Sequence, residues 1–189
     1  MQLVVPSLQF IDSYAQALAR GWSPDNMRAA QAQEELEKIK ADPDAFLASL
    51  DSTQVAGEPV TMPDGSQVPR LPGFRRWMWD GEFCGSLGFR WQRGTPELPP
   101  YCLGHIGYAV VPWKRRLGYA AQALQQFLPE ARALGLPYVE LTVAHDNAIS
   151  KRVIEKCGGV FVEAFPLPAC YGVGTEWRYR IDLLKLLVE

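Results

Sequence analysis

Hydrophobic positions recur every three or four residues between residues 118 and 135, which is the spacing of an amphipathic helix. One helical face would carry Ala120, Leu124, Phe127, Leu128, Ala131 and Leu134. Gly135 follows this face as a helix stop signal. Pro129 lies inside it, where a proline predicts a kink or an interruption. The pattern therefore predicts a core-facing helix that begins after Gly118.

A period of two residues replaces the helical spacing around residues 74–91. The segments "FRRWMW" and "EFCGSLGFRW" flank Asp80-Gly81, a dipeptide that favours a two-residue hairpin turn. In the second segment, large apolar side chains alternate with small or polar ones, which is typical of a half-buried strand. These large side chains are Phe83, Leu87, Phe89 and Trp91. The sequence thus predicts an antiparallel pair of strands here.

Two strand–helix units and two further strands fill the second half of the chain. The apolar run Cys102–Val111 predicts a strand before the long helix, and "YVELTV" predicts one after it. Asp146 or Asn147 can cap the next helix, "AISKRVIEKC", which a glycine pair ends. The segments "VFVEAF" and "TEWRYRIDL" predict the last two strands, separated by the loop "PLPACYGVG".

Helix start signals dominate the N-terminal part of the chain. A first helix is expected over about residues 7–20. The triplets "SPD" and "DPD" each place a capping side chain before a proline, which predicts a polar surface helix over 23–40 and a short helix over 42–50. Residues 55–73 are rich in proline and glycine, and predict a long loop with a small hairpin.

This order of elements predicts the fold class. Helices come first, then an antiparallel hairpin, then two strand–helix units, then strands. Such an order is typical of a mixed α/β fold with a mostly antiparallel sheet flanked by helices. At 189 residues the chain can bury one substantial core and is short for two. We therefore expect residues 1–189 to form a single domain.

Composition and charge narrow the range of partners. Hydrophobic residues make up 48% and charged residues 21% of the chain, as in globular proteins. The net charge of −2 provides no general attraction for nucleic acid, so any anion site must be local. No apolar run is long enough to span a membrane, and the N-terminus lacks a signal-peptide pattern. We expect a cytoplasmic protein without nucleic-acid or membrane partners.

The cysteines and histidines form no metal-binding pattern. Cys84, Cys102, Cys157 and Cys170 are widely spaced without a CxxC pair, and the chain has only two histidines. A disulfide framework is not expected in a reducing compartment. We interpret the cysteines as small apolar side chains rather than nucleophiles, and expect no metal cofactor.

The segment "RRLGYA", residues 115–120, joins a strand to the long helix and has two interpretations. It could be a solvated basic turn that only connects two elements. It could also bind an anion, because the first amides of a helix lack internal partners and carry partial positive charge. Gly118 permits close backbone approach, and Lys114, Arg115 and Arg116 can pair with phosphate. Neither a Walker motif nor a dinucleotide fingerprint is present, so the residues alone leave both interpretations open.

The stretch "GYAVVPWKRRLGYAAQAL" resembles the acetyl-CoA-binding motif of the GNAT family of N-acetyltransferases. That motif follows a strand with an arginine or glutamine, a glycine and a small residue at a helix start, matched here by Arg115, Gly118 and Ala120. Downstream, "VELTVAHDNAISKRVIEKCGG" resembles the family's next strand–helix unit. The resemblance covers about residues 104–161, and is strongest to a poorly characterised subgroup with "GHIGY" before the motif.

The resemblance implies a GNAT-like fold with a splayed central strand pair, and acetyl-CoA as cosubstrate. The backbone of Val110 and Val111, at the splayed end of the strand, would hydrogen-bond the pantetheine arm. Asn147 and Ser150 would contact the far side of that arm, and Asn147 could equally be a plain helix cap. The amides that would hold the pyrophosphate are those of Arg115, Arg116, Leu117, Gly118, Tyr119 and Ala120.

Acetyl transfer to an amine requires that a proton leave the amine, and His105 is the first candidate for the base. It lies on the strand where some family members carry a glutamate, and imidazole titrates near neutrality. A structural histidine at a strand start is the alternative. Glu140 and Glu82 are weaker candidates, because either can simply face solvent, and His145 is expected to be a turn residue.

Many family members carry a tyrosine in the last helix that protonates the departing thiolate. The matching position here is Ile154, a departure that removes the expected acid. Tyr171, in the loop before the last strand, is a weak substitute, because loop tyrosines are usually packing residues. A thiolate can also leave without a strong acid, so activity is not excluded.

The sequence therefore predicts an N-acetyltransferase that moves an acetyl group from acetyl-CoA directly to a primary amine in a ternary complex. An alternative from another class is a non-catalytic acyl-CoA-binding or regulatory module, to which Ile154 points. A third interpretation is an unrelated α/β binding domain without CoA affinity. The sequence does not identify the acceptor, a small molecule or a peptide, and the chain could form a homodimer.

Overall fold

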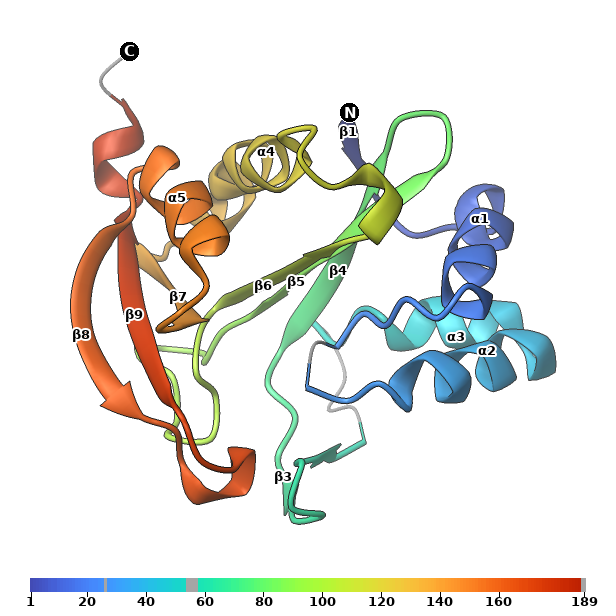
Figure 1. Ribbon diagram of the computed structural model, residues 1–189, viewed down its shortest axis with the longest axis horizontal. Coiled ribbons are helices and arrows are strands. Elements are labelled where there is room, and N and C mark those ends of the chain that lie inside the picture. The colour runs from blue at the N-terminus through green and yellow to red at the C-terminus, as the bar shows by residue number, and fades with distance from the viewer. Residues whose placement is uncertain (26, 54–57, 188–189) are drawn as a thin grey trace.

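The computed structural model describes residues 1–25, 27–53 and 58–187, and its strands form two larger antiparallel sheets and one small pair (Figure 1). The first sheet has the order β1-β4-β5-β6, formed by Gln2–Val4, Gly73–Trp79, Phe83–Arg90 and Ile106–Val110. The second has the order β7-β9-β8, formed by Tyr138–Ala144, Thr175–Asp182 and Val160–Pro166. The small pair joins β2 (Val60–Thr61) to β3 (Gln67–Val68).

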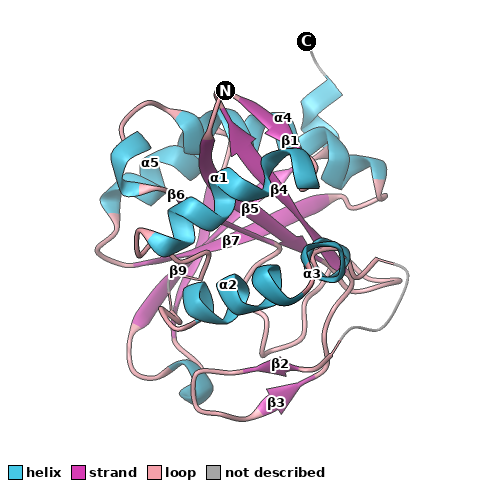
Figure 2. Ribbon diagram, turned by 90° about the vertical axis from the view of Figure 1, so that its right-hand side faces the viewer, coloured by secondary structure: helices cyan, strands magenta, loops and turns pink. Residues whose placement is uncertain are grey.

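Helices cover both faces of the first sheet. On one face lie α1 (Leu8–Ala19), α2 (Gln31–Ala41) and α3 (Pro43–Ser49), and Figure 2 shows α1 and α2 in front of the strands. On the other face lies α4 (Tyr119–Ala133), with α5 (Ala148–Lys156) beside it and against β7. Short 3-10 turns are η1 (Pro112–Lys114), η2 (Ala169–Tyr171) and η3 (Leu184–Leu187). The predicted mixed α/β fold with a mostly antiparallel sheet is confirmed.

Each face of the first sheet has its own hydrophobic core. Leu124 and Phe127 of α4 are buried against both sheets, together with Leu141 of β7. On the opposite face, Tyr14 of α1 stacks on Trp77 of β4 with ring centroids 4.4 Å apart. β5 lies between the two cores and contributes to both. It is therefore buried on both faces, and not half-buried as predicted, because it is an inner strand of the sheet.

Two strand boundaries differ from the sequence prediction. Trp79 pairs with Phe83, so residues 80–82 form the hairpin turn, and the predicted two-residue turn is one residue too short. β6 begins later than the predicted Cys102, because the Cys102 amide donates to the Pro99 carbonyl in a turn. The predicted small hairpin is the β2–β3 pair, and residues 55–57 of the predicted loop lie outside the described residues.

Local capping decides where the N-terminal helices begin. Asp42 caps α3 as predicted, and accepts a hydrogen bond from the Ala45 amide at 2.9 Å. The predicted helix start at Ser23 is wrong, because α2 begins only at Gln31. Asp25 accepts hydrogen bonds from the amides of the residues two and three positions later, and this closes a local turn instead of a helix.

The predicted interruption of the long helix at Pro129 is also wrong. α4 continues to Ala133, and its residues Phe127, Leu128 and Ala131 are buried along the continuous face. Tertiary packing of this face outweighs the hydrogen bond that proline removes. Gly135, with φ 83°, follows the helix end as predicted.

A buried charge network joins α2 to the first sheet. Glu35 of α2 is 5% exposed and pairs with Arg75 of β4 at 2.8 Å. The Tyr14 hydroxyl donates to Glu35 Oε2. The side-chain amide of Gln31 donates to Glu35 Oε1, the oxygen that also pairs with Arg75, at 2.7 Å. These bonds satisfy the buried carboxylate. α2 is therefore not the purely surface helix that its polar sequence predicts.

β6 and β7 belong to different sheets and approach each other just before β6 begins. The His105 amide donates to the Glu140 carbonyl at 2.7 Å, and Nδ1 of the His105 ring accepts from the Glu140 amide at 3.0 Å. Gly104 allows this approach, because a Cβ atom there would lie 3.0 Å from the Glu140 oxygen. Beyond this contact the two strands diverge, and the predicted splayed pair is present (Figure 1).

Candidate active site

The connection from β6 to α4 leaves a helix start without a side-chain cap. Residues 115–118 are exposed, and Gly118 has φ 78°, in the left-handed region that glycine adopts without strain. Because Gly118 stands at the cap position, the first amides of α4 are left for solvent or a ligand. The predicted pyrophosphate residues lie here, Arg115, Arg116 and Leu117 in the loop and Tyr119 and Ala120 in the first turn.

The basic side chains of this loop differ in their partners. Lys114 bonds to Asp80 at 3.1 Å and to Glu82 at 2.7 Å, both in the β4–β5 turn. Its charge is therefore already matched by two carboxylates, so it is not free to pair with phosphate as expected. Arg115 and Arg116 are exposed, and within the described residues neither pairs with a carboxylate.

The β4–β5 turn also anchors the first residue of α4. The Tyr119 hydroxyl donates to Asp80 Oδ2 at 2.6 Å. Burial raises the pKa of Asp80, but hydrogen bonds from Tyr119 and Lys114 outweigh it and lower that pKa to about 2. Asp80 is thus ionised near neutral pH. It holds the loop in place before any anion binds.

Val110, the last residue of β6, and Val111, which follows it, differ in how their backbone groups are bonded. The Val111 amide donates to the Cys84 carbonyl of β5 at 2.9 Å, and the Val111 carbonyl accepts from the Lys114 amide at 3.0 Å. Neighbouring residues of a strand direct their backbone groups to opposite edges, so those of Val110 point toward the gap beside β7. The Val110 carbonyl accepts a long hydrogen bond from Arg115 Nε at 3.4 Å, so Val110 fits the expected pantetheine contact through its amide. Both backbone groups of Val111 are already bonded.

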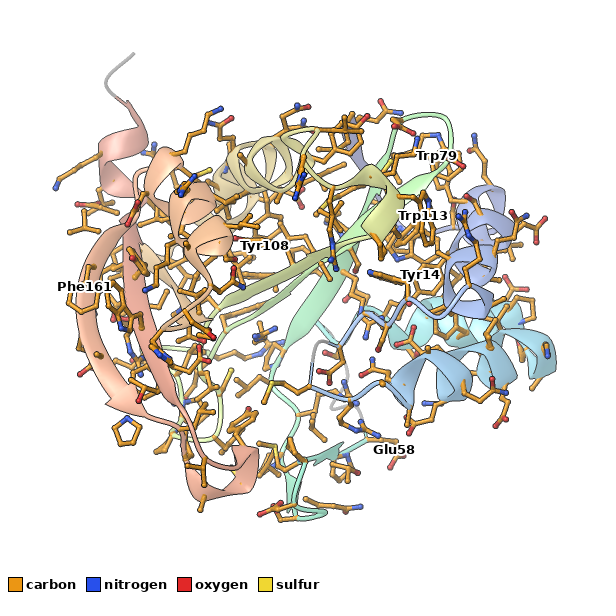
Figure 3. The ribbon with its side chains drawn as sticks, viewed as in Figure 1. Tyr14, Glu58, Trp79, Tyr108, Trp113 and Phe161 are labelled. Carbon is orange, nitrogen blue, oxygen red and sulfur yellow. The ribbon has the colours of Figure 1, made fainter. Side chains whose placement is uncertain are left out.

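On the other side of the gap, α5 and its N-cap carry two expected residues, and Ser150 of α5 contacts a residue of β6 that the sequence analysis missed. Asn147 caps the helix, and its Oδ1 accepts from the Ser150 amide at 3.1 Å. The hydroxyl oxygens of Ser150 and of Tyr108 on β6 are 2.7 Å apart, and Figure 3 shows Tyr108 between the strand and the helix. Burial raises the pKa of Tyr108 to about 12, so this phenol keeps its proton at neutral pH.

The side chain of His105 lies at the junction of the two sheets and is 1% exposed. Since Nδ1 accepts from the Glu140 amide, the neutral ring carries its proton on Nε2, which is enclosed by protein. Burial lowers the pKa of His105 to about 4. Neither nitrogen is free to take a proton from an amine, so this geometry favours the structural alternative.

Glu140, the second candidate base, binds two arginines of β9. It is 6% exposed, and its two oxygens accept from Arg180 at 2.7 Å and from Arg178 at 2.8 Å. Burial raises the pKa of this carboxyl, but the hydrogen bonds from the two arginines outweigh burial and lower it. A carboxylate held in this way is a weak proton acceptor.

The remaining positions considered for acid–base chemistry are Tyr171, Ile154, Glu82 and His145. Tyr171 and Glu82 are bonded to other groups, Ile154 is buried, and His145 is exposed. The Tyr171 hydroxyl donates to the Tyr101 carbonyl at 2.7 Å, and burial raises the pKa of Tyr171 to about 12. Ile154 is 1% exposed in the core beneath α5. Glu82 pairs with the lysine of the loop, and His145 is exposed in the turn after β7.

The structure offers no metal site in the ranges that it describes, where no group of three or more His, Cys, Asp or Glu residues could hold an ion. All four cysteines are free thiols, and Cys84 and Cys157 are buried as small apolar side chains. Within the same part of the chain, no helix combines the length and the apolar character needed to cross a bilayer.

Comparison with known proteins identifies the class to which this fold and loop belong. The family model described as "Acetyltransferase (GNAT) domain" matches residues 10–160. The match spans most of the chain, and the protein belongs to the GNAT acetyltransferases. No curated protein gives a significant sequence match.

Solved structures share this fold at low sequence identity. A spermidine N-acetyltransferase variant, SpeG from Vibrio cholerae, has a TM-score of 0.57 and 14% identity over 100% of this chain and 98% of its own. The microcin self-immunity acetyltransferase MccE, in complex with acetyl-CoA and AMP, has a TM-score of 0.56 and 12% identity over 95% and 91%. A protein described as a probable acetyltransferase has a TM-score of 0.62 and 16% identity over 97% and 93%. At these identities the likeness shows the fold alone.

Proposed function

We propose that the protein transfers the acetyl group of acetyl-CoA directly to a primary amine of an acceptor in a ternary complex. The observation that carries the proposal is the gap between β6 and β7, with an uncapped helix start beside it. Val110 lies on one side of this gap, Ser150 on the other, and Gly118 at the helix start. Membership of the GNAT family supports acetyl-CoA as the donor.

The donor is held by backbone groups in this proposal. The amides of residues 115–120 bind the pyrophosphate, because a helix start offers unpaired N–H groups and partial positive charge. Arg115 and Arg116 add charge that no described carboxylate neutralises. Val110 bonds the pantetheine as a neighbouring strand would, and Asn147 contacts it from α5. The pantetheine then occupies the space that a continuous β6–β7 ladder would close.

Tyr108 and Ser150 form the proton donor in this account. The amine nitrogen attacks the thioester carbonyl carbon, the carbon–sulfur bond breaks, and the departing sulfur takes a proton. The hydroxyl pair spans β6 and α5 with its oxygens 2.7 Å apart, and it therefore lies across the gap. This hydroxyl pair takes the role of the tyrosine that many family members carry at the position of Ile154. The side chain of Ile154 is buried in the core.

The proton of the amine passes to solvent rather than to His105. Both ring nitrogens of His105 are unavailable, and Glu140 is bonded to two arginines. The acceptor therefore binds as the neutral amine. Its kcat/KM should rise with pH until the pKa of the acceptor amine is passed, because only the neutral form attacks.

Amine-dependent release of free CoA thiol tests the proposed activity. The assay offers acetyl-CoA with a panel of primary amines of differing size and charge, and detects the acetylated amine by mass spectrometry. Direct transfer predicts that release requires the amine and that no acetylated protein accumulates without it. An acetylated protein formed in the absence of amine would contradict direct transfer.

The second candidate function is a non-catalytic acyl-CoA-binding or regulatory module. Ile154 in place of the family's tyrosine favours it. This candidate predicts saturable acetyl-CoA binding without thiol release for any amine in the same panel. Thiol release that falls in Tyr108→Phe would decide for the enzyme.

A further inference from the structure

Arg90 is the last residue of β5, and its side chain lies over two glycines of the sheet, Gly88 and Gly107. Gly88 and Gly107 pair across β5 and β6. A Cβ atom on Gly107 would lie 3.4 Å from Nη1 and 3.6 Å from Nη2 of Arg90, so the guanidinium occupies the space that a side chain would fill. Ala109 and Val111 contact the core beneath α1–α3, and alternate residues of a strand share a face. Arg90 therefore lies on the α1–α3 face of the sheet.

The guanidinium of Arg90 is half-buried and lacks a counter-charge. Its Nε donates to the Gly104 carbonyl at 2.8 Å. In the part of the chain that the structure describes, no carboxylate pairs with it. The other arginines of β4 and β9 do have such partners, namely Arg75 with Glu35, Arg76 with Glu130, and Arg178 and Arg180 with Glu140. A half-buried charge without a partner is unfavourable until an anion binds.

Arg90 also lies close to the place where the acetyl group would be delivered. Gly107 precedes Val110 by three positions on β6, which is about 10 Å along a strand. Burial raises the pKa of Tyr171, in the loop before β9, to about 12, and the charge of Arg90 lies near enough to oppose part of that rise. An acceptor amine at the thioester can therefore place a group several bonds away on Arg90.

We propose that the acceptor is an amine that carries a carboxylate, and that Arg90 binds this carboxylate. The inference rests on the proposed acetyl transfer and names the class of its acceptor. The guanidinium presents two parallel N–H groups, which match the two oxygens of a carboxylate. Gly88 and Gly107 carry no side chains that could cover the guanidinium. The carboxylate itself takes no part in the reaction.

Matched acceptors that differ only in charge test this proposal. Each pair consists of an amino acid or dipeptide and its carboxamide, with the amine nitrogen about three to six bonds from the carboxylate carbon: β-alanine and β-alaninamide, glycylglycine and glycylglycinamide, 6-aminohexanoate and 6-aminohexanamide. Phosphoethanolamine against ethanolamine tests whether a phosphate is preferred instead. Thiol release is measured with the wild type, Arg90→Gln and Arg90→Lys. Arg132→Gln, in the last turn of α4, removes a positive charge elsewhere and is the control.

For at least one pair, the acid should exceed its amide in kcat/KM by about 10- to 100-fold, the size expected of a hydrogen bond to a charged group. The difference should lie mainly in KM. It should disappear in Arg90→Gln, persist in part in Arg90→Lys and stay unchanged in Arg132→Gln. The turnover of the amides should change little in any variant, because they make no ion pair with Arg90.

Two results would overturn the proposal while leaving acetyl transfer intact. One is turnover of acids and amides at equal kcat/KM, or a preference confined to the phosphate. The other is an equal loss for acid and amide in Arg90→Gln, which a role of Arg90 only in holding the Gly104 carbonyl predicts. Absence of thiol release with every amine would overturn both the proposed function and this inference.

Discussion

The ring of His105 accepts, through Nδ1, a hydrogen bond from the backbone amide of Glu140 at 3.0 Å, and the His105 amide donates to the Glu140 carbonyl at 2.7 Å. A side chain thus adds one bond to the backbone pairing where β6 and β7 separate. The contact sets where the gap between the sheets begins. It also sets how much of the β6 edge remains available to a ligand.

Replacing His105 should affect stability more than chemistry. His105→Ala leaves the Glu140 amide buried without an acceptor, which lowers the free energy of unfolding by about 1–3 kcal/mol. His105→Asn can present an oxygen near the position of Nδ1 and should lose less. Urea unfolding measures both values. The kcat of both variants should stay within about 10-fold of the wild type, whereas loss of a general base costs about 100- to 10,000-fold. A loss of that size with unchanged stability would contradict the structural role.

The buried ring also predicts how stability depends on pH. Burial lowers the pKa of His105 from 6.5 to about 4 in the folded protein. Between these values the unfolded chain binds a proton that the folded protein does not, so stability is lost as the pH falls through this window. The loss amounts to at most about 3.5 kcal/mol, because each pKa unit corresponds to about 1.4 kcal/mol. Urea unfolding at a series of pH values should give a shallower slope in His105→Asn, and equal slopes would refute the prediction.

Removal of the Tyr108 hydroxyl should slow acetyl transfer without weakening donor binding. Tyr108→Phe leaves the ring in place and removes the proton donor. The expected fall in kcat is about 10- to 100-fold, at or below the lower end of the range for a general acid, because a thiolate leaves readily. Ser150→Ala should have a smaller effect, since Tyr108 retains its proton. Steady-state kinetics and acetyl-CoA affinity are compared in all three proteins, and unchanged kcat in Tyr108→Phe would exclude this residue as the donor.

Gly118 and Gly135 provide a matched pair at the two ends of α4. Both have positive φ, 78° and 83°, and an added Cβ would meet no atom closer than 3.6 Å at either position. An alanine at either position should therefore lower the free energy of unfolding by a similar amount, about 1–2 kcal/mol. Only Gly118→Ala should also weaken acetyl-CoA binding, because only Gly118 lies where the pyrophosphate would approach the backbone. Equal affinity in the two variants would count against the loop as the anion site.

The parts of the fold that the sequence predicts are those controlled by local chemistry. Asp42 and Asn147 act as helix caps as predicted, because a cap bonds to amides two or three residues away. The strand–loop–helix around Gly118 was also predicted, since its glycine and its flanking periodicity are local signals. Asp25 shows the limit of such signals: its side chain does bond to nearby amides, but it closes a turn and not a helix.

The contacts that the sequence did not reveal join residues far apart in the chain. Glu35 pairs with Arg75, and Ser150 with Tyr108, across separations of 40 and 42 residues. No periodicity encodes which polar residue meets which across two elements. The His105–Glu140 contact is of the same kind, and a histidine in a sequence carries no sign of whether its nitrogens are free. For this reason the loop that we propose to bind the donor could be located from the sequence, whereas the proposed proton donor and the proposed acceptor contact were inferred only with the structure.

Calorimetric titration of acetyl-CoA tests the central claim most directly. The wild type should bind acetyl-CoA saturably at one site per chain. Gly118→Asp should abolish binding, because a carboxylate at this position blocks the approach of the pyrophosphate and repels its charge. Gly135→Asp, at the other end of α4, should bind like the wild type. A wild-type protein that is folded by circular dichroism and shows no binding would contradict the account, and so would undiminished binding by Gly118→Asp.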